Sequence, residues 1–230
     1  MWVIFVGKGM EREGYRSEAT TLEGFIQQLA VGYVSRGYVF YVCGRVPDRK
    51  EPDAVDRQLV AKYGIAVSKW ARSRRKRAGY ANLQYLRFER FFVLLATPGP
   101  HPFFEEEAKL IRDCREVPIK FGGYAVGSSG RLARVRIERG QYNLLKAHFC
   151  DLALRRSGPT LERMIATLPF EPYAAVYRQL WGLVRAVNQI RKAAGYNPIA
   201  PELRKWRRTV RPFASMKLGL AGESMVQPKV

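Results

Sequence analysis

The residues of this chain that could make or break bonds gather in one short segment, residues 101–113. Its four candidate catalytic residues are His101, Glu105, Glu106 and Asp113. A histidine beside carboxylates could hold Mg²⁺ or act as a general base on a phosphodiester. The competing interpretation is structural, because acids in the first turn of a helix are stabilised by its dipole. His101 also lies between two prolines, which is typical of a structural position.

A second catalytic candidate is Tyr142, which follows the last predicted strand and could attack DNA as a nucleophile. Nickases and transposases of the tyrosine HUH type place such a tyrosine beside a strand carrying His-hydrophobic-His. The two histidines here, His101 and His148, are far apart and form no such pair. The glycines at 122–123 and 127–130 fit neither a P-loop nor a Rossmann turn. We therefore expect no cofactor and no metal, with Mg²⁺ required only if residues 101–113 form a nuclease site.

Charge is a stronger signal than any catalytic motif. The chain has 40 Lys and Arg against 20 Asp and Glu, a net charge of +20. Residues 68–80, SKWARSRRKRAGY, hold six cations and no acid, and such clustering favours a polyanionic partner that relieves the repulsion. Cations neutralise phosphates, and flanking aromatic rings can stack on unpaired bases. The nucleic-acid contacts predicted here are Lys69, Trp70, Arg72, Arg74, Arg75, Lys76, Arg77 and Tyr80.

Two further basic patches extend this predicted footprint. In the strand expected at residues 132–138, the period of two puts Arg134 and Arg136 on one face. This patch consists of Lys120, Tyr124, Arg131, Arg134 and Arg136. A simpler interpretation is a polar strand face that meets solvent. The third patch repeats the mixture of cations and tryptophan and consists of Arg204, Lys205, Trp206, Arg207, Arg208 and Arg211. Three patches suit a duplex or a folded RNA better than one point contact.

Other features of the sequence limit the alternatives. No apolar stretch reaches the roughly 18 residues of a membrane span, and residues 1–6 are interpreted as a first strand and not as a signal peptide. Three cysteines and two histidines lack zinc-site spacing and a disulfide framework, which favours the cytoplasm. Anionic lipid and an acidic protein remain alternative partners. The chain, however, has no basic amphipathic helix or lipidation signal.

The elements that must position these residues alternate between helix and strand up to residue 138. We predict an α+β fold, with a mixed, mainly antiparallel sheet domain at 1–138, a C-terminal helical layer at 139–212 and a tail at 213–230. In the sheet domain, Thr20 and Glu23 form a predicted capping box. Helices are expected there at 22–33, at 53–63 and from residue 102. Strands are expected at 38–46, 83–96, 119–126 and 132–138. The predicted helices of the layer are 141–156, 160–168, 173–194 and a basic one at 202–208.

These observations favour a cytoplasmic nucleic-acid-binding protein that grips phosphates through several patches of cations and aromatic residues. RNA is favoured over DNA because Tyr, Trp and Phe are abundant among the cations and no helix-turn-helix or zinc module is evident. The protein would be an RNA or ribonucleoprotein component, with other subunits of the complex as further partners. The alternatives are a metal-dependent nuclease or DNA strand-transfer enzyme, and a structural subunit of a larger assembly.

Overall fold

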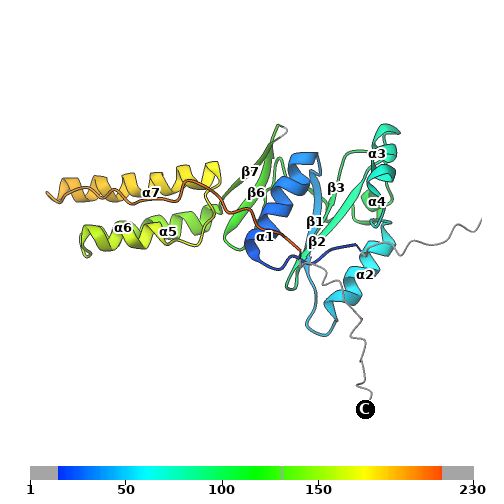
Figure 1. Ribbon diagram of the computed structural model, residues 1–230, viewed down its shortest axis with the longest axis horizontal. Helices are drawn as coiled ribbons and strands as arrows, with labels where there is room; N and C mark the ends of the chain where they lie inside the picture. The colour runs from blue at the N-terminus through cyan, green and yellow to red at the C-terminus, as the bar shows by residue number, and fades with distance from the viewer. Residues whose placement is uncertain (1–14, 131, 214–230) are drawn as a thin grey trace, which may run out of the picture.

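The structure, a computed structural model, describes residues 15–130 and 132–213 (Figure 1). The strand predicted at residues 1–6, the predicted contact Arg131 and all of the predicted tail except Phe213 lie outside this range. Two antiparallel sheets flank a central helix, and a pair of helical layers projects from the second sheet as an arm. The predicted α+β fold is confirmed.

The first sheet has the strand order β2-β3-β1-β4 and is antiparallel throughout. Its strands are β1 (Phe40–Arg45), β2 (Leu83–Phe88), β3 (Phe91–Ala96) and β4 (Arg112–Asp113). The single strand predicted over 83–96 is wrong, because Glu89 takes the left-handed conformation at φ 52° and reverses the chain into a hairpin. Leu83 therefore pairs with Ala96, which pairs on its other side with Phe40.

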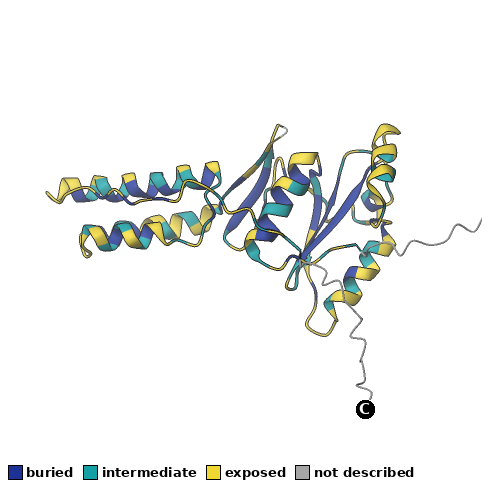
Figure 2. Cartoon of the chain, viewed as in Figure 1, coloured by how far each residue is buried: buried dark blue, intermediate teal, exposed yellow. Residues whose placement is uncertain are grey.

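Both faces of the first sheet are covered, so its strands are apolar on both sides (Figure 2). Leu86, Val93 and Leu95 belong to the core that includes the central helix. Tyr85 and Leu94 belong to a second, smaller core on the other face. That face is covered by α2 (Pro52–Lys62) and α4 (Phe103–Glu106). The helix predicted at 53–63 begins one residue earlier, because Glu51 is the N-cap and Pro52 the first residue.

The central helix changes its winding along its length. It consists of α1 (Leu22–Gln27), the π-helical η1 (Gln28–Tyr33) and the 3₁₀ turn η2 (Val34–Arg36). Thr21, and not the predicted Thr20, is its cap, and its Oγ1 accepts from the Gly24 N–H at 3.0 Å. A π-helical stretch is rare and is often found at functional sites.

The second sheet has the order β5-β6-β7 and packs on the opposite side of the central helix. Its strands are β5 (Ile119–Phe121), β6 (Tyr124–Ser129) and β7 (Leu132–Ile137). The predicted strand 119–126 is divided by a turn in which Gly122 and Gly123 have positive φ values of 54° and 78°. Ser128 and Ser129 then pair with Ala133 and Leu132 near the tip of the β6–β7 hairpin.

The arm contains α5 (Arg139–Leu152), α6 (Gly158–Ala166) and α7 (Ala174–Ala193), close to the three helices predicted there. The fourth predicted helix, at 202–208, is wrong. Residues 199–213 return along the arm to α1 without regular structure (Figure 1). Their backbone groups bind side chains instead: the Ile199 N–H donates to Asn188 Oδ1 at 2.8 Å, and the Arg208 N–H donates to Glu171 Oε2 at 3.1 Å.

Within the described ranges, no helix is both long and apolar enough to cross a membrane.

Candidate nucleic-acid interface

The predicted basic segment forms a helix, α3 (Lys69–Arg77), on the surface of the first sheet's end (Figure 1). Ser68 begins it, because its Oγ accepts from the Ala71 N–H at 3.1 Å. No residue of α3 is buried. Within residues 15–130 and 132–213, none of its six cations forms an ion pair, so α3 presents its positive charge uncompensated.

Two of these cations are fixed by hydrogen bonds to backbone carbonyls. Arg72 donates from a terminal nitrogen to the Val67 carbonyl at 2.7 Å, and Arg75 donates to the Gly64 carbonyl at 3.3 Å. A carbonyl orients a guanidinium without removing its charge, and the other donors of each group stay available. Arg72 and Arg75 are therefore held in place while their charges stay available to an anion.

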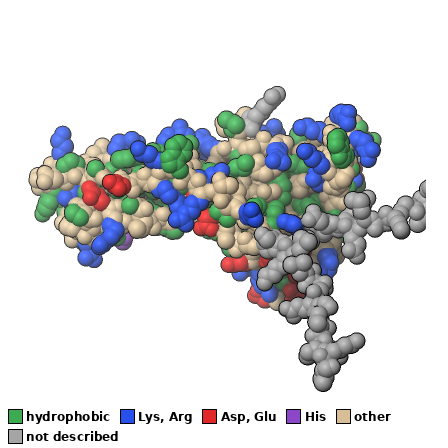
Figure 3. All heavy atoms as spheres, viewed as in Figure 1, with side chains coloured by type: hydrophobic (Ala, Val, Ile, Leu, Met, Phe, Trp, Pro, Cys, Tyr) green, Lys and Arg blue, Asp and Glu red, His purple; other side chains and the backbone are tan. Residues whose placement is uncertain are grey.

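Aromatic side chains accompany the cations of α3, as predicted. Trp70 is 77% exposed and Tyr80 is 55% exposed, which is unusual for such large apolar groups. Basic and hydrophobic side chains share the surface at this end of the molecule (Figure 3). A surface of this composition can pair with phosphates and stack on bases.

The hairpin patch is only partly as predicted. Arg134 and Arg136 alternate with the buried Val135 and Ile137, so the two arginines share the outer face of β7. Lys120 is paired with Glu138 at 2.8 Å. Tyr124 is wrong as a contact: it is 2% exposed, and its hydroxyl accepts from the Glu171 N–H at 2.8 Å. Tyr124 pairs with the buried Ile137 of β7, so it lies on the core face of the sheet, opposite to the two arginines.

The third patch is divided between structural and exposed residues. Arg204 pairs with Glu171 at 2.5 Å, while Arg207 donates to Gln27 Oε1 at 3.0 Å and lies over the Tyr173 ring. These two arginines attach the returning segment to the arm and to α1. Trp206 is 84% exposed, and the exposed cations beside it are Lys205, Arg208 and Arg211.

The predicted catalytic segment does not assemble into one site. α4 has four residues and carries Glu105 and Glu106, whereas Asp113 lies on β4. Glu106 pairs with Lys62 at 2.7 Å, and Asp113 accepts from Arg115 Nε at 2.9 Å. Among the residues that the structure describes, no three His, Cys, Asp or Glu side chains are placed to hold a metal.

His101 and Tyr142 have structural partners instead. His101 Nδ1 accepts from the Phe103 N–H at 3.1 Å, and burial, together with the nearby Arg75, lowers the pKa of its imidazole. Tyr142 donates its hydroxyl hydrogen to the Gln179 carbonyl at 3.1 Å, which joins α5 to α7, and burial raises its pKa. A hydroxyl engaged in this way is poorly placed to attack a strand, so the interpretation of Tyr142 as a nucleophile is not supported.

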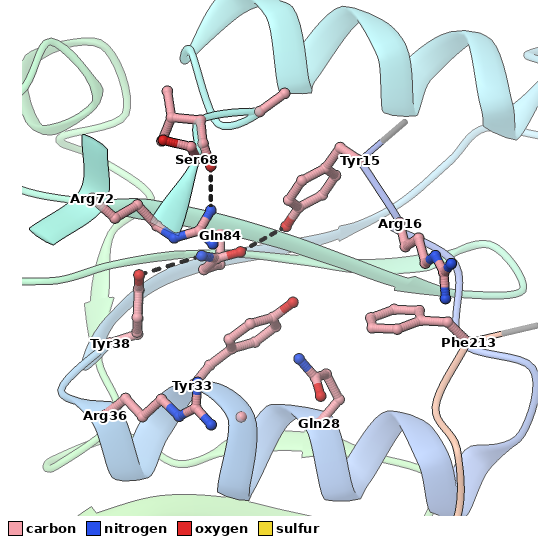
Figure 4. A pocket seen from close by; sticks show the side chains of 13 residues that line it. Tyr15, Arg16, Gln28, Tyr33, Arg36, Tyr38, Ser68, Arg72, Gln84 and Phe213 are labelled. Atoms are coloured by element: carbon pink, nitrogen blue, oxygen red, sulfur yellow. Dashed lines mark hydrogen bonds between the residues drawn. The ribbon is translucent and has the colours of Figure 1, made fainter. Parts of the chain in front are cut away.

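Sequence reasoning missed a pocket of about 650 Å³ beside α3 (Figure 4). Its walls come from segments distant in the sequence, so no local spacing could have revealed it. Three kinds of side chain line it: the tyrosines Tyr15, Tyr33 and Tyr38, the glutamines Gln28 and Gln84, and the arginines Arg16, Arg36 and Arg72. The one signal in the sequence was Arg36 between Tyr33 and Tyr38, just after the helix predicted at 22–33.

The back wall of this pocket is ordered by hydrogen bonds. The Tyr15 hydroxyl lies 3.0 Å from Gln84 Oε1 and 2.7 Å from the Tyr85 carbonyl, and it accepts from the Tyr85 N–H at 2.8 Å. Gln84 Nε2 in turn donates to the Tyr38 hydroxyl at 3.3 Å. Burial raises the pKa of Tyr15 and of Tyr33, so both rings stay neutral at physiological pH.

A second hollow adjoins this pocket at Arg36, which lines both. It is lined on one side by Lys76 of α3 and on the other by Ser128 and Gly130 at the tip of the β6–β7 hairpin. Ser35 joins the same region, because its Oγ accepts from the Ala133 N–H at 3.3 Å. α3 and the tip of the β6–β7 hairpin, far apart in the sequence, therefore lie on opposite sides of one concave surface.

No protein-family model matches this chain, and the comparison with curated proteins gives no match.

Proposed function

We propose that this chain binds nucleic acid and that α3 is its main phosphate-binding element. The observation that carries the proposal is the concentration of positive charge on α3, whose nine residues hold six cations and no acid. Arg87, Lys62 and Arg204 each pair with an acid of the same chain. Among the described residues the six α3 cations pair with no acid, and a phosphate backbone would supply the missing anions while releasing its counterions.

RNA with unpaired bases is the partner we favour, as a component of a ribonucleoprotein. Trp70, Tyr80 and Trp206 expose their rings next to cations that pair with no acid of the described residues, and stacking on such rings requires bases that are not paired in a duplex. The nuclease alternative has less support, because Glu106 and Asp113, which it needs as metal ligands, pair with Lys62 and Arg115.

The proposal is tested by titrating a labelled single-stranded RNA at increasing salt. If several α3 cations contact phosphates, affinity falls steeply between about 50 and 200 mM salt. Changing Lys69, Arg74 and Arg77 to Ala together should weaken binding and reduce the salt slope by about two, since each phosphate contact with a single strand contributes roughly 0.7. These three side chains make no hydrogen bond to the described residues, so the fold should be unaffected.

The matched control removes the same number of charges from the arm, by changing Lys146, Arg156 and Arg163 to Ala. All three are exposed, so this variant has the same net charge as the α3 variant. We expect it to keep nearly all of the wild-type affinity and salt slope. Equal losses of affinity in the two variants would show that only the net charge matters and that α3 has no special role. A flat salt response of the wild type would contradict nucleic-acid binding.

A further inference from the structure

The pocket between η1 and α3 has the size of a small-molecule site. Its volume of about 650 Å³ lies within the range of about 300–1,000 Å³ typical of ligand pockets. In Figure 4, Tyr33 and Gln28 point into it from the central helix, Arg72 approaches from the opposite wall, and Gln84 forms the back. The pocket is therefore a built concavity with side chains converging from three elements.

The chemistry of these walls suits a nucleotide. Tyr33 and Tyr38, whose rings pack edge to face 5.9 Å apart, offer an aromatic wall against which a base can lie. Gln28 and Gln84 offer amide donors and acceptors for the edge of a base. Gln84 keeps capacity for this, because its hydrogen bonds to the described residues use one hydrogen of its Nε2 and one lone pair of its Oε1.

Two arginines line this pocket where the phosphate of a bound nucleotide would lie. Arg72 is held by the Val67 carbonyl, so its guanidinium is already oriented at the wall. Arg36 is exposed at the junction with the second hollow, where Lys76 follows along α3. A strand running along α3 would therefore pass the mouth of the pocket with its backbone between Arg36 and Lys76.

Residues of η1 form the floor of this pocket. Gln28 and Gly32 both line the pocket, and an added Cβ at Gly32 would lie 2.7 Å from the Gln28 amide carbon. The missing side chain at position 32 therefore leaves the space that the Gln28 carboxamide occupies. A glycine inside a helix costs stability relative to alanine, which points to a local requirement for this space.

We propose that this pocket binds one unpaired nucleotide of the bound strand, its base against Tyr33 and Tyr38 and its phosphate toward Arg36 and Arg72. The inference rests on the proposed nucleic-acid binding and deepens it. It identifies what reads the base while α3 binds the backbone. Because the pocket lies beside α3, one strand can contact α3 and place a nucleotide in the pocket at the same time.

The test uses a short single-stranded RNA that carries one 2-aminopurine, whose fluorescence is quenched when its base stacks. Full-length protein is titrated while anisotropy reports affinity and fluorescence reports stacking. Two variants perturb the pocket. Gly32→Ala displaces the flexible end of Gln28 without removing core volume, and Arg36→Ala removes an exposed cation. Arg163→Ala, on the arm, is the control with equal charge loss.

We expect both pocket variants to lose roughly tenfold in affinity, in the range of one stacked base, and to lose much of the quenching. The control should retain both. If the pocket variants bind and quench as the wild type does, the base stacks elsewhere: the pocket assignment is overturned, while nucleic-acid binding stands. If the wild type binds no RNA at any salt concentration, both proposals are overturned. Circular dichroism of each variant shows whether it is folded.

Discussion

Arg87 of the edge strand β2 donates from its guanidinium Nε to both carboxylate oxygens of Asp56 in α2, at 2.9 Å each. Asp56 also accepts from the Tyr85 hydroxyl at 2.6 Å and from Ser17 Oγ at 2.7 Å. These bonds join α2, β2 and the segment before α1. The same strand carries Gln84 into the nucleotide pocket, so the buried pair fixes the scaffold on which that pocket stands.

The first prediction concerns this buried pair. Arg87 is 2% exposed, and Arg87→Ala leaves the carboxylate of Asp56 buried without its cation. The loss should reduce the free energy of unfolding by about 3–5 kcal/mol, as for other broken buried pairs. Urea denaturation measures it. Arg155→Ala is the control, because Arg155 pairs with Asp151 at the surface and should cost less than about 1 kcal/mol. Similar losses in both variants would contradict a special role for the buried pair.

The second prediction separates stacking from charge on α3. Trp70→Ala removes an exposed ring and no charge, so stability and the salt slope should stay as in the wild type. Affinity for single-stranded RNA should fall by roughly 1–3 kcal/mol, the usual contribution of one stacked base. Affinity for a duplex of the same length should change little. A competition assay between the two forms measures this difference, and an equal loss for both would show that Trp70 does not stack on bases.

The third prediction is a pH dependence of stability that comes from His101. Its pKa is lowered from 6.5 in the folded protein by burial and by Arg75, so the folded state disfavours the protonated ring. The contribution of His101 is therefore fully present above the unfolded pKa and is lost as pH falls from about 7 toward 5. His101→Asn keeps an acceptor for the Phe103 N–H but does not titrate.

Thermal unfolding at a series of pH values tests this assignment. The wild type should lose more stability than His101→Asn between about pH 7 and 5, and the two curves should run parallel at higher pH. Parallel curves over the whole range would show that His101 titrates as it does in the unfolded chain.

The fourth prediction distinguishes a binder from a nuclease. Glu106→Gln removes the carboxylate that pairs with Lys62 at the surface, so the unfolding midpoint should hardly move. A labelled strand incubated with wild type and Mg²⁺ or Mn²⁺ should stay intact, and the variant should behave identically. Metal-dependent cleavage that disappears in Glu106→Gln would restore the nuclease alternative.

Local patterns in the sequence predicted much of the fold. The two-residue period of residues 132–137 correctly placed Arg134 and Arg136 outside and Val135 and Ile137 inside, because a strand alternates its side chains. Helical spacing found α5, α6 and α7 to within a few residues. The same reasoning failed for 202–208, where helical composition competes with contacts to Glu171 and Gln27 that come from distant segments.

Composition and charge clustering, which are local properties, were enough to single out α3 and to predict a polyanionic partner. Which cations are free was decided by the tertiary structure, since Arg204 and Arg134 look alike in the sequence but only Arg204 meets a carboxylate among the described residues. The pocket was likewise beyond sequence reasoning. Tyr15, Tyr33 and Gln84 converge because β2 lies beside the central helix, and such convergence depends on how the elements pack, which no spacing along the chain encodes.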